Sequence, residues 1–231
     1  FTAAGHRAVA PDLFGFGKSD KPVEDATYTW DFHRNMLIGF VEKLGLQNIT
    51  LVCQDWGGLL GLTLPMDMPG RFSRLIVMNT ALGTGDVPLG KGFEDWRDYC
   101  ASTHDLPVGG LFARSDPSLS QTELAAYDAP FPTADYKAGV RRFPQLVPAT
   151  PDAPGAETSR RARDWWRNHW EGKSFMAIGM QDPVLGPPAM RALRKLIAGC
   201  PEPLEIEDGG HFVQERGERI AEAALAYFEA D

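Results

Sequence analysis

Short apolar runs alternate with longer amphipathic stretches along this chain, and no other feature constrains the fold as strongly. The apolar runs have the length and composition of strands and cover residues 7–10, 49–54, 75–79, 175–180 and 204–206. Helical patterns lie between or after them, at residues 29–44, 58–66, 191–197 and 217–228. Strands separated by helices form parallel sheets covered on both faces, so the sequence predicts an α/β fold with a mostly parallel sheet flanked by helices.

Residues 83–173 interrupt this alternation. They carry turn signals such as "DVPLGKG" and "VPATPDAPG", helical pieces at residues 121–127 and 157–170, and many aromatic side chains. These aromatics either form the small core of a helical subdomain or line an apolar pocket over the strand ends, and the two interpretations are compatible. We therefore expect a helical cap at residues 83–173, inserted between a first core part at 1–82 and a second at 174–231.

Composition excludes several classes of function. The net charge is −8 and no basic stripe is present, which argues against a nucleic-acid partner. No apolar segment is long enough to span a membrane, so no membrane partner is expected. Cys53, Cys100 and Cys200 are an odd number at unrelated spacings, typical of reduced thiols in a cytoplasmic protein and not of a metal site. We expect a cytoplasmic monomer that needs no metal.

An aspartate stands where the apolar run 49–54 meets the next helical pattern. Asp is a poor strand residue, and a buried carboxylate is costly without partners. The stretch Cys53-Gln54-Asp55-Trp56-Gly57 has the small-x-nucleophile-x-small pattern of a nucleophile elbow, with Asp in place of the more common Ser. This pattern makes Asp55 a candidate nucleophile, whereas alone it could also be a helix cap.

Two further polar residues follow later strand ends. Asp182 comes after the run 175–180, and His211 comes after Gly209-Gly210, just past the run 204–206. Singly, Asp182 could be a turn residue and His211 a surface histidine. The order nucleophile, acid, histidine is the one that α/β-hydrolases use, so the three together predict a catalytic triad.

A carboxylate nucleophile selects a different reaction from a serine. It is ionised at neutral pH and suits attack on a saturated carbon, which leaves an alkyl ester on the enzyme. His211 would then deprotonate a water that hydrolyses the ester, and Asp182 would orient the imidazole. The backbone N–H of Trp56 would help to hold the oxyanion of that step.

The sequence resembles the haloalkane dehalogenases, especially the subfamily typified by the xanthobacter enzyme. The motifs that carry the resemblance are "PDLFGFGKSDKP", "FHRN", "LVCQDWGGLLGLTLPM", "AAYDAPFP", "AGVRRFP", "FMAIGMQD", "CPEPLEI" and "GGHFVQE". The resemblance runs over nearly the whole chain, cap included. It implies hydrolysis of a small apolar halogenated substrate to an alcohol and halide, with water as co-substrate and without a cofactor.

The resemblance also implies a substrate pocket. The Trp56 indole would be the first halide donor, and Leu59 and Phe112 would line the pocket. Alignment through Pro117 and Tyr127 places Ser115 where similar dehalogenases carry a second halide-binding Trp. Loss of that donor would cost about 1–3 kcal/mol of leaving-group stabilisation. Four other tryptophans are candidates for a replacement donor: Trp96, Trp165, Trp166 and Trp170.

The front of the chain differs from the family pattern. In the family, three strands and a His-Gly motif precede the point where this chain starts, and the residue after that motif completes the oxyanion hole. The third of those strands lies between the strands that correspond to residues 7–10 and 49–54. We therefore expect a fragment with an open slot in its sheet, and residues 1–231 alone to be marginally stable or inactive.

Two alternatives stay open. An epoxide hydrolase with the same Asp-His-Asp triad would use paired cap tyrosines as acids, for which Tyr127 and Tyr136 are the candidates. A non-catalytic or truncated α/β-hydrolase-fold protein would keep the triad by descent, as Ser115 and the missing front would allow.

Overall fold

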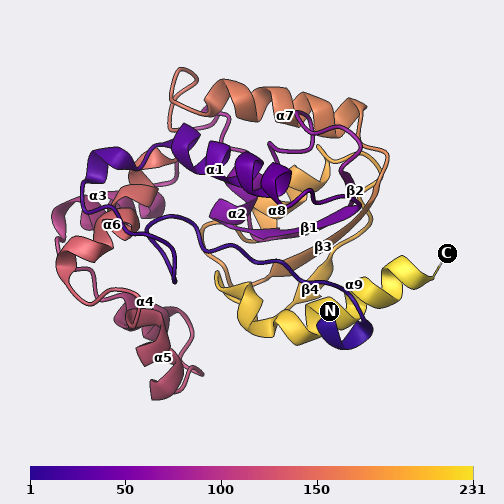
Figure 1. Ribbon diagram of the computed structural model, residues 1–231. Coiled ribbons are helices and arrows are strands. Elements are labelled where there is room, and N and C mark those ends of the chain that lie inside the picture. Colours follow the sequence, from indigo (N-terminus) through magenta and orange to yellow (C-terminus); the bar gives the residue numbers. More distant parts are fainter. Residues whose placement is uncertain (231) are drawn as a thin grey trace.

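The protein is described here from a computed structural model that covers residues 1–230. Four parallel strands form one sheet in the order β1-β2-β3-β4 (Figure 1). Their bounds are Ile49–Gln54 for β1, Phe72–Met78 for β2, Lys173–Gly179 for β3 and Leu204–Ile206 for β4. The α/β class and four of the five predicted strands are therefore confirmed.

The strand predicted at residues 7–10 is wrong. This segment has no regular secondary structure, and within residues 1–230 no strand pairs with it. A four-residue run forms a strand only where a neighbour accepts its hydrogen bonds, and local composition cannot supply that neighbour. On the described chain β1 is an edge of the sheet that pairs only with β2, and Val52 on it is 45% exposed.

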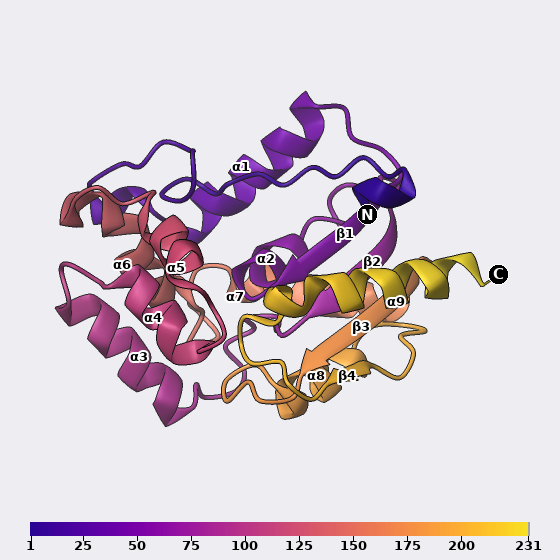
Figure 2. The same cartoon turned by 90° about the horizontal axis from the view of Figure 1, so that it is seen from below.

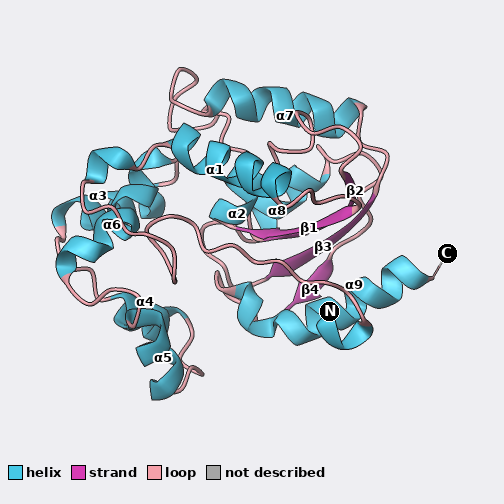
Figure 3. Cartoon of the chain, viewed as in Figure 1, coloured by secondary structure: helices cyan, strands magenta, loops and turns pink. Residues whose placement is uncertain are grey.

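Nine α-helices surround or extend the sheet in residues 1–230 (Figure 3). They are α1 Trp30–Lys43, α2 Trp56–Gly61, α3 Lys91–Ser102, α4 Val108–Ser115, α5 Gln121–Asp128, α6 Ala138–Leu146, α7 Ala156–Asn168, α8 Pro187–Arg194 and α9 Gly217–Glu229. Short 3₁₀ turns occur at η1 Thr2–Ala4, η2 Asp25–Thr27, η3 Ala134–Lys137 and η4 Val213–Arg216. None of the described helices is long and apolar enough to cross a bilayer.

Two predicted helices have shifted bounds. The pattern predicted at residues 58–66 forms α2, which starts two residues earlier, at Trp56, and ends five residues earlier, at Gly61. Pro65 lacks the N–H that a continuing helix needs. The pattern at 191–197 starts earlier, at Pro187, where the fixed φ of proline suits the first helical turn. The other predicted helices agree with the structure to within two residues.

The sheet buries an apolar cluster on each face, as strand alternation requires. On β2, Val77 packs into one cluster and Ile76 into the other. The first cluster receives Trp166 from α7 and Met190 from α8, while the second is covered by α9. Figure 1 shows α8 and α9 on opposite faces of the strands.

Helices α3 to α6, with the turns between them, are termed the cap; they lie to one side of the sheet, beyond one end of the strands (Figures 1 and 2). They come from the segment between β2 and β3 that was expected to form a cap. Helix α7 belongs to the same segment but packs Ala162 and Trp166 against the sheet. The three-part division at residues 82/83 and 173/174 stays a prediction.

Hydrogen bonds from Arg34 join α1 to the turn that follows α2. Its Nε donates to Thr63 Oγ1 at 2.9 Å, Nη2 donates to Thr63 O at 3.0 Å, and Nη2 also contacts the Asp67 carboxylate. Thr63 is completely buried, so these bonds replace water that it cannot reach. Arg161 reaches Asp67 from the other side at 3.4 Å but is 59% exposed.

Replacement of Arg34 by Met should lower the free energy of unfolding by about 1–3 kcal/mol, because Thr63 loses buried donors. The matched change Arg161→Met should cost less than about 1 kcal/mol, since it removes only a solvent-exposed pair. Urea denaturation of both variants measures the difference. Equal losses in the two variants would contradict this account of the α1 contact.

Candidate active site

Asp55 occupies a strained turn between β1 and α2. Its backbone has φ 46° and ψ −121°, a conformation that non-glycine residues rarely adopt. The turn is held because Asp55 N–H donates to Asn79 O at 3.0 Å and Thr80 Oγ1 donates to Asp55 O at 2.7 Å. Thr80 approaches so closely that a Cβ on Gly58 would lie 2.2 Å from its hydroxyl oxygen. Small residues and close packing thus keep the Asp55 side chain at the tip of the turn.

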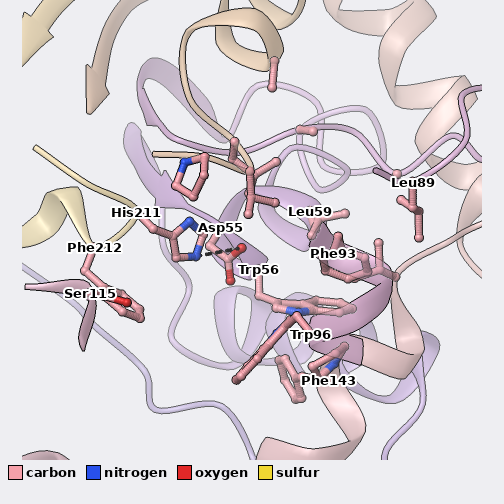
Figure 4. A pocket seen from close by; sticks show the side chains of 18 of the residues that line it. Asp55, Trp56, Leu59, Leu89, Phe93, Trp96, Ser115, Phe143, His211 and Phe212 are labelled. Carbon is pink, nitrogen blue, oxygen red and sulfur yellow. Dashed lines mark ion pairs between the residues drawn. The ribbon is translucent and has the colours of Figure 1, made fainter. Parts of the chain in front are cut away.

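The structure brings the three predicted triad side chains together. His211 Nδ1 lies 2.9 Å from Asp182 Oδ2, and His211 Nε2 lies 3.7 Å from Asp55 Oδ1. Figure 4 shows the imidazole edge facing the Asp55 carboxylate, with a dashed line between them. The second distance is too long for a direct hydrogen bond, and the two groups form an ion pair when His211 is protonated. The catalytic roles of these three residues stay predictions.

Asn79 is a site residue that was not predicted from the sequence. It is fully buried at the end of β2, and its Nδ2 donates to Asp182 Oδ2 at 2.9 Å and to Gly179 O at 3.2 Å. Its Oδ1 accepts from Gly179 N–H at 2.7 Å. Asn79 therefore holds the carboxylate of Asp182 in place. The sequence signal was present, because Asn79 ends an apolar run just as Asp55 does.

The loop that carries His211, residues 207–212 (the histidine loop), is anchored to the strand ends. Gln54 Nε2 donates to His211 O at 2.9 Å, and Gln181 N–H donates to Gly209 O at 2.8 Å. The loop also runs against β3, where a Cβ on Gly179 would lie 2.4 Å from Gly210 O. Glycine at position 179 is needed for this close approach.

Asp182 and His211 shift each other's protonation. Burial alone would raise the pKa of Asp182, but the hydrogen bond and charge of His211, with bonds from Asn79 and Val184 N–H, hold it below its usual range. Burial alone would lower the pKa of His211, but the bond to Asp182 and the charges of Asp55 and Asp182 outweigh it and raise that pKa. The arrangement favours an ionised Asp182 and an imidazole that readily accepts a proton.

Asp55 has a different environment. Burial raises its pKa, the nearby Asp182 charge adds to that rise, and His211 and the backbone N–H of Trp56 oppose it. About a third of the Asp55 side chain is exposed, and it faces a cavity. A carboxylate with little hydration and one backbone donor is a stronger nucleophile than one in bulk water.

The cavity over the strand ends has a volume of ≈ 1710 Å³ and a predominantly apolar wall. Four residues predicted for the substrate site lie in that wall: Trp56, Leu59, Phe112 and Ser115. The cap contributes aromatic side chains, of which Phe143 packs edge-on against Trp56 with ring centroids 4.7 Å apart. An apolar cavity with a carboxylate at its base suits an uncharged substrate.

One of the four candidate replacement tryptophans reaches this cavity. Trp96, on α3, is part of its wall and lies on the Trp56 side of the site in Figure 4. The other three form a cluster beside the sheet: Trp165, Trp166 and Trp170. Trp166 Nε1 donates to Leu62 O at 2.7 Å and Trp170 Nε1 to Ser174 Oγ at 2.9 Å, so both of these indole donors are already used.

Ser115 lies elsewhere on the cavity wall. It is the exposed last residue of α4, and its backbone carbonyl faces Gly210 of the histidine loop. Figure 4 places Ser115 beside Phe212, on the opposite side of His211 from Trp56. The described residues contain no cluster of His, Cys, Asp or Glu suited to a metal ion.

Comparison with known proteins gives a consistent family. The α/β-hydrolase-fold family matches residues 1–218. Haloalkane dehalogenase from Psychrobacter cryohalolentis is 43% identical over 231 residues, which cover 98% of this chain and 75% of that protein. Haloalkane dehalogenase from Mycobacterium marinum is 40% identical over 232 residues, covering 97% of this chain and 76% of that protein.

Solved structures agree with the sequence comparison. The tetrameric structure of haloalkane dehalogenase DpaA from Paraglaciecola agarilytica NO2 superposes with a TM-score of 0.97 at 54% identity, covering 100% of this chain and 77% of that one. Haloalkane dehalogenase DatA from Agrobacterium tumefaciens C58 has a TM-score of 0.77 at 22% identity, a likeness of fold. The chain thus spans about three quarters of the proteins that it matches.

The ion pair across the site predicts a pKa change. In Asp55→Asn the pKa of His211 should fall relative to the unsubstituted protein, because one of the two charges that stabilise the imidazolium is removed. Asp86→Asn is the matched control, since Asp86 also lines the cavity but pairs with Arg163. NMR titration of the imidazole signals measures both. An unchanged His211 pKa in Asp55→Asn would show that the pair does not form.

Proposed function

Because the chain belongs to the haloalkane dehalogenase family of α/β-hydrolase-fold proteins, we propose that it hydrolyses the carbon–halogen bond of small apolar haloalkanes. The products are an alcohol, a halide ion and a proton. The observation that carries this proposal is the strained turn that presents a carboxylate, Asp55, into an apolar cavity opposite a His–Asp pair. A carboxylate in this place suits displacement at a saturated carbon.

In the first step Asp55 is the nucleophile. A carboxylate oxygen attacks the carbon that bears the halogen, a carbon–oxygen bond forms, and the carbon–halogen bond breaks with its electron pair leaving as halide. This step has no base that would deprotonate Asp55, so the Asp55 carboxylate must already be ionised when substrate binds. The ion pair with His211 supports the ionised form against the effect of burial.

In the second step His211 is the base. Its Nε2 takes a proton from water as the water oxygen attacks the carbonyl carbon of the Asp55 ester. Collapse of the tetrahedral intermediate then releases the alcohol and restores the carboxylate. One proton passes from the imidazole to solvent. Asp182 holds Nδ1 at 2.9 Å, which orients Nε2 toward Asp55 and stabilises the imidazolium. Alkylation removes the charge of Asp55, which lowers the pKa of His211, so an imidazolium paired with Asp55 releases its proton to solvent and His211 then acts as the neutral base.

Trp56 supports both steps. Its backbone N–H contacts the Asp55 carboxylate and is placed to hold the oxyanion of the second step. Its indole lies in the cavity wall together with that of Trp96, and neither indole N–H has a protein acceptor within residues 1–230. Two indole donors in an apolar cavity can stabilise a departing halide. The position of Trp96 favours it over Ser115 as the second donor.

The epoxide hydrolase alternative has less support. That reaction needs an acid, for which Tyr127 and Tyr136 were the candidates. Tyr127 lines the cavity, but its hydroxyl donates to the Glu215 carboxylate, and burial with that bond raises its pKa to about 12. Tyr136 is 40% exposed and, in the described structure, lies outside the cavity wall.

The first test is halide release from 1,2-dibromoethane. The test uses the protein at the full length of its relatives, of which this chain spans about three quarters. That protein should release bromide and protons, and Asp55→Asn should reduce the rate to background because no nucleophile remains. His211→Phe should release one equivalent of bromide and then stop, with the alkyl group detectable on Asp55 by mass spectrometry. A folded protein that neither releases bromide nor becomes alkylated would remove the dehalogenase proposal, and hydrolysis of an epoxide would then favour the alternative.

A second test concerns the halide donors. Trp96→Phe should lower kcat/KM by about 5–150-fold, which corresponds to loss of about 1–3 kcal/mol from one donor to a charged acceptor. Trp165→Phe is the matched control and should change kcat/KM by less than about twofold, because Trp165 packs beside the sheet outside the cavity wall. Bromide titration of the remaining tryptophan fluorescence should show weaker binding in Trp96→Phe alone. Equal effects would exclude Trp96 as a donor.

A further inference from the structure

The cap contacts the chain immediately after His211. Phe112, on α4, lies between two aromatic rings, Tyr127 of α5 at 3.6 Å and Phe212 at 4.0 Å between centroids. The three rings are nearly parallel, with interplanar angles of 15° and 20°. Phe212 is the neighbour of His211, and their rings meet edge-on at 5.2 Å. A continuous series of aromatic contacts therefore runs from the cap to His211.

Two polar contacts reinforce this stack. The Tyr127 hydroxyl donates to the Glu215 carboxylate, and Arg216 Nη1 donates to Asp116 Oδ2 at 3.0 Å. Asp116 directly follows α4, and its side chain is 13% exposed, while that of Arg216 is 23% exposed. Burial of this degree makes a charge pair stronger and more dependent on its geometry than an open surface pair.

Arg216 also closes the segment that contains His211. Its Nε donates to Asp208 Oδ2 at 3.0 Å. The guanidinium of Arg216, which follows His211 in the chain, therefore binds both Asp208, which precedes His211, and Asp116 of the cap. Arg219, one helical turn further on, binds Asp208 alone at 2.6 Å and makes no ion pair with the cap in the described structure. The two arginines thus differ in whether they connect the histidine loop to the cap.

Figure 1 shows α4 and α5 as a pair projecting from the side of the molecule, and Gly109 N–H bonds Asp128 Oδ1 at 2.8 Å between them. Movement of this pair would therefore be transmitted to Phe212, Glu215 and Arg216. The nucleophile lies on a different element, the turn between β1 and α2, and has no contact with these polar groups in the described structure.

We propose that Asp116, Tyr127, Glu215 and Arg216 form a latch between the cap and residues 207–216, the segment that carries His211, and that they are positioning residues for His211 when it activates water. This inference rests on the proposed function. It predicts a selective defect: alkylation of Asp55 should proceed normally, whereas hydrolysis of the ester should slow, because a base that is displaced by a fraction of an ångström deprotonates water poorly.

The test uses rapid-mix kinetics with 1,2-dibromoethane. Tyr127→Phe keeps the stacked ring and removes the hydroxyl, and Asp116→Asn keeps the side-chain shape and removes the charge. In each, kcat should fall about 5–50-fold. The initial burst of bromide should stay within about twofold of the unsubstituted rate, since the nucleophile is untouched, and alkylated Asp55 should accumulate during turnover.

Arg219→Gln is the matched control and should leave both steps unchanged, since it alters a salt bridge to Asp208 without altering the cap contact. The double variant Asp116→Asn with Arg216→Gln should be no slower than the slower single variant, because partners in one contact are not additive. The latch is overturned if Arg219→Gln shows the same defect, if the burst slows in parallel with kcat, or if Tyr127→Phe and Asp116→Asn turn over normally.

An NMR measurement separates failure of the latch from failure of the proposed function. The His211 imidazole signals should shift in Tyr127→Phe and Asp116→Asn but not in Arg219→Gln. If the unsubstituted protein neither releases bromide nor becomes alkylated, the proposed dehalogenase function fails by itself. The role of the latch in placing His211 then fails only if these imidazole signals are the same in all variants.

Discussion

The parallel register of the four strands is the constraint on which the site depends. It brings the carboxyl ends of β1, β2, β3 and β4 to one edge, so the residues that follow each strand meet there. The hydrogen bonds continue past the strands: Asp55 N–H donates to Asn79 O, and Met180 N–H donates to Ile206 O. Asn79 then joins two of these ends through its side chain, which fixes Asp182. A shift of one residue in this register would separate the acid from the histidine.

The electrostatics of the site follow from its position between sheet and cap. Two carboxylates and one imidazole share a partly buried space, so each charge is supported by a partner or by backbone N–H groups. Asp182 receives bonds from Asn79 and from the N–H groups of Val184 and Leu185, and it is completely enclosed. Asp55 has fewer donors and opens to the cavity. The same residue type thus has two environments, one that holds a charge and one that leaves it reactive.

The cap both lines the cavity and binds the core through polar side chains. Its apolar side chains form the cavity wall, while its polar side chains fasten it to the core at separate points. On one side Arg141 donates to Asp25 Oδ1 at 3.0 Å and Arg142 to Tyr28 O at 3.3 Å, which holds α6 and with it Phe143 beside Trp56. On the other side Asp116, just after α4, and Tyr127 of α5 bind η4, the 3₁₀ turn that follows the histidine loop. The cap therefore contacts the regions that carry the nucleophile and the base.

The sequence alone determined the α/β class, four strands and the order Asp55, Asp182, His211, because these follow from local periodicity and from motif spacing along the chain. It could not determine whether residues 7–10 pair, since a strand needs a neighbour that composition does not specify. Only the tertiary structure revealed Asn79 beside Asp182, Trp96 in the cavity, and Arg216 between Asp208 and Asp116. These contacts join residues that are distant in sequence, and their geometry depends on how the cap packs against the strand ends, for which no local pattern exists.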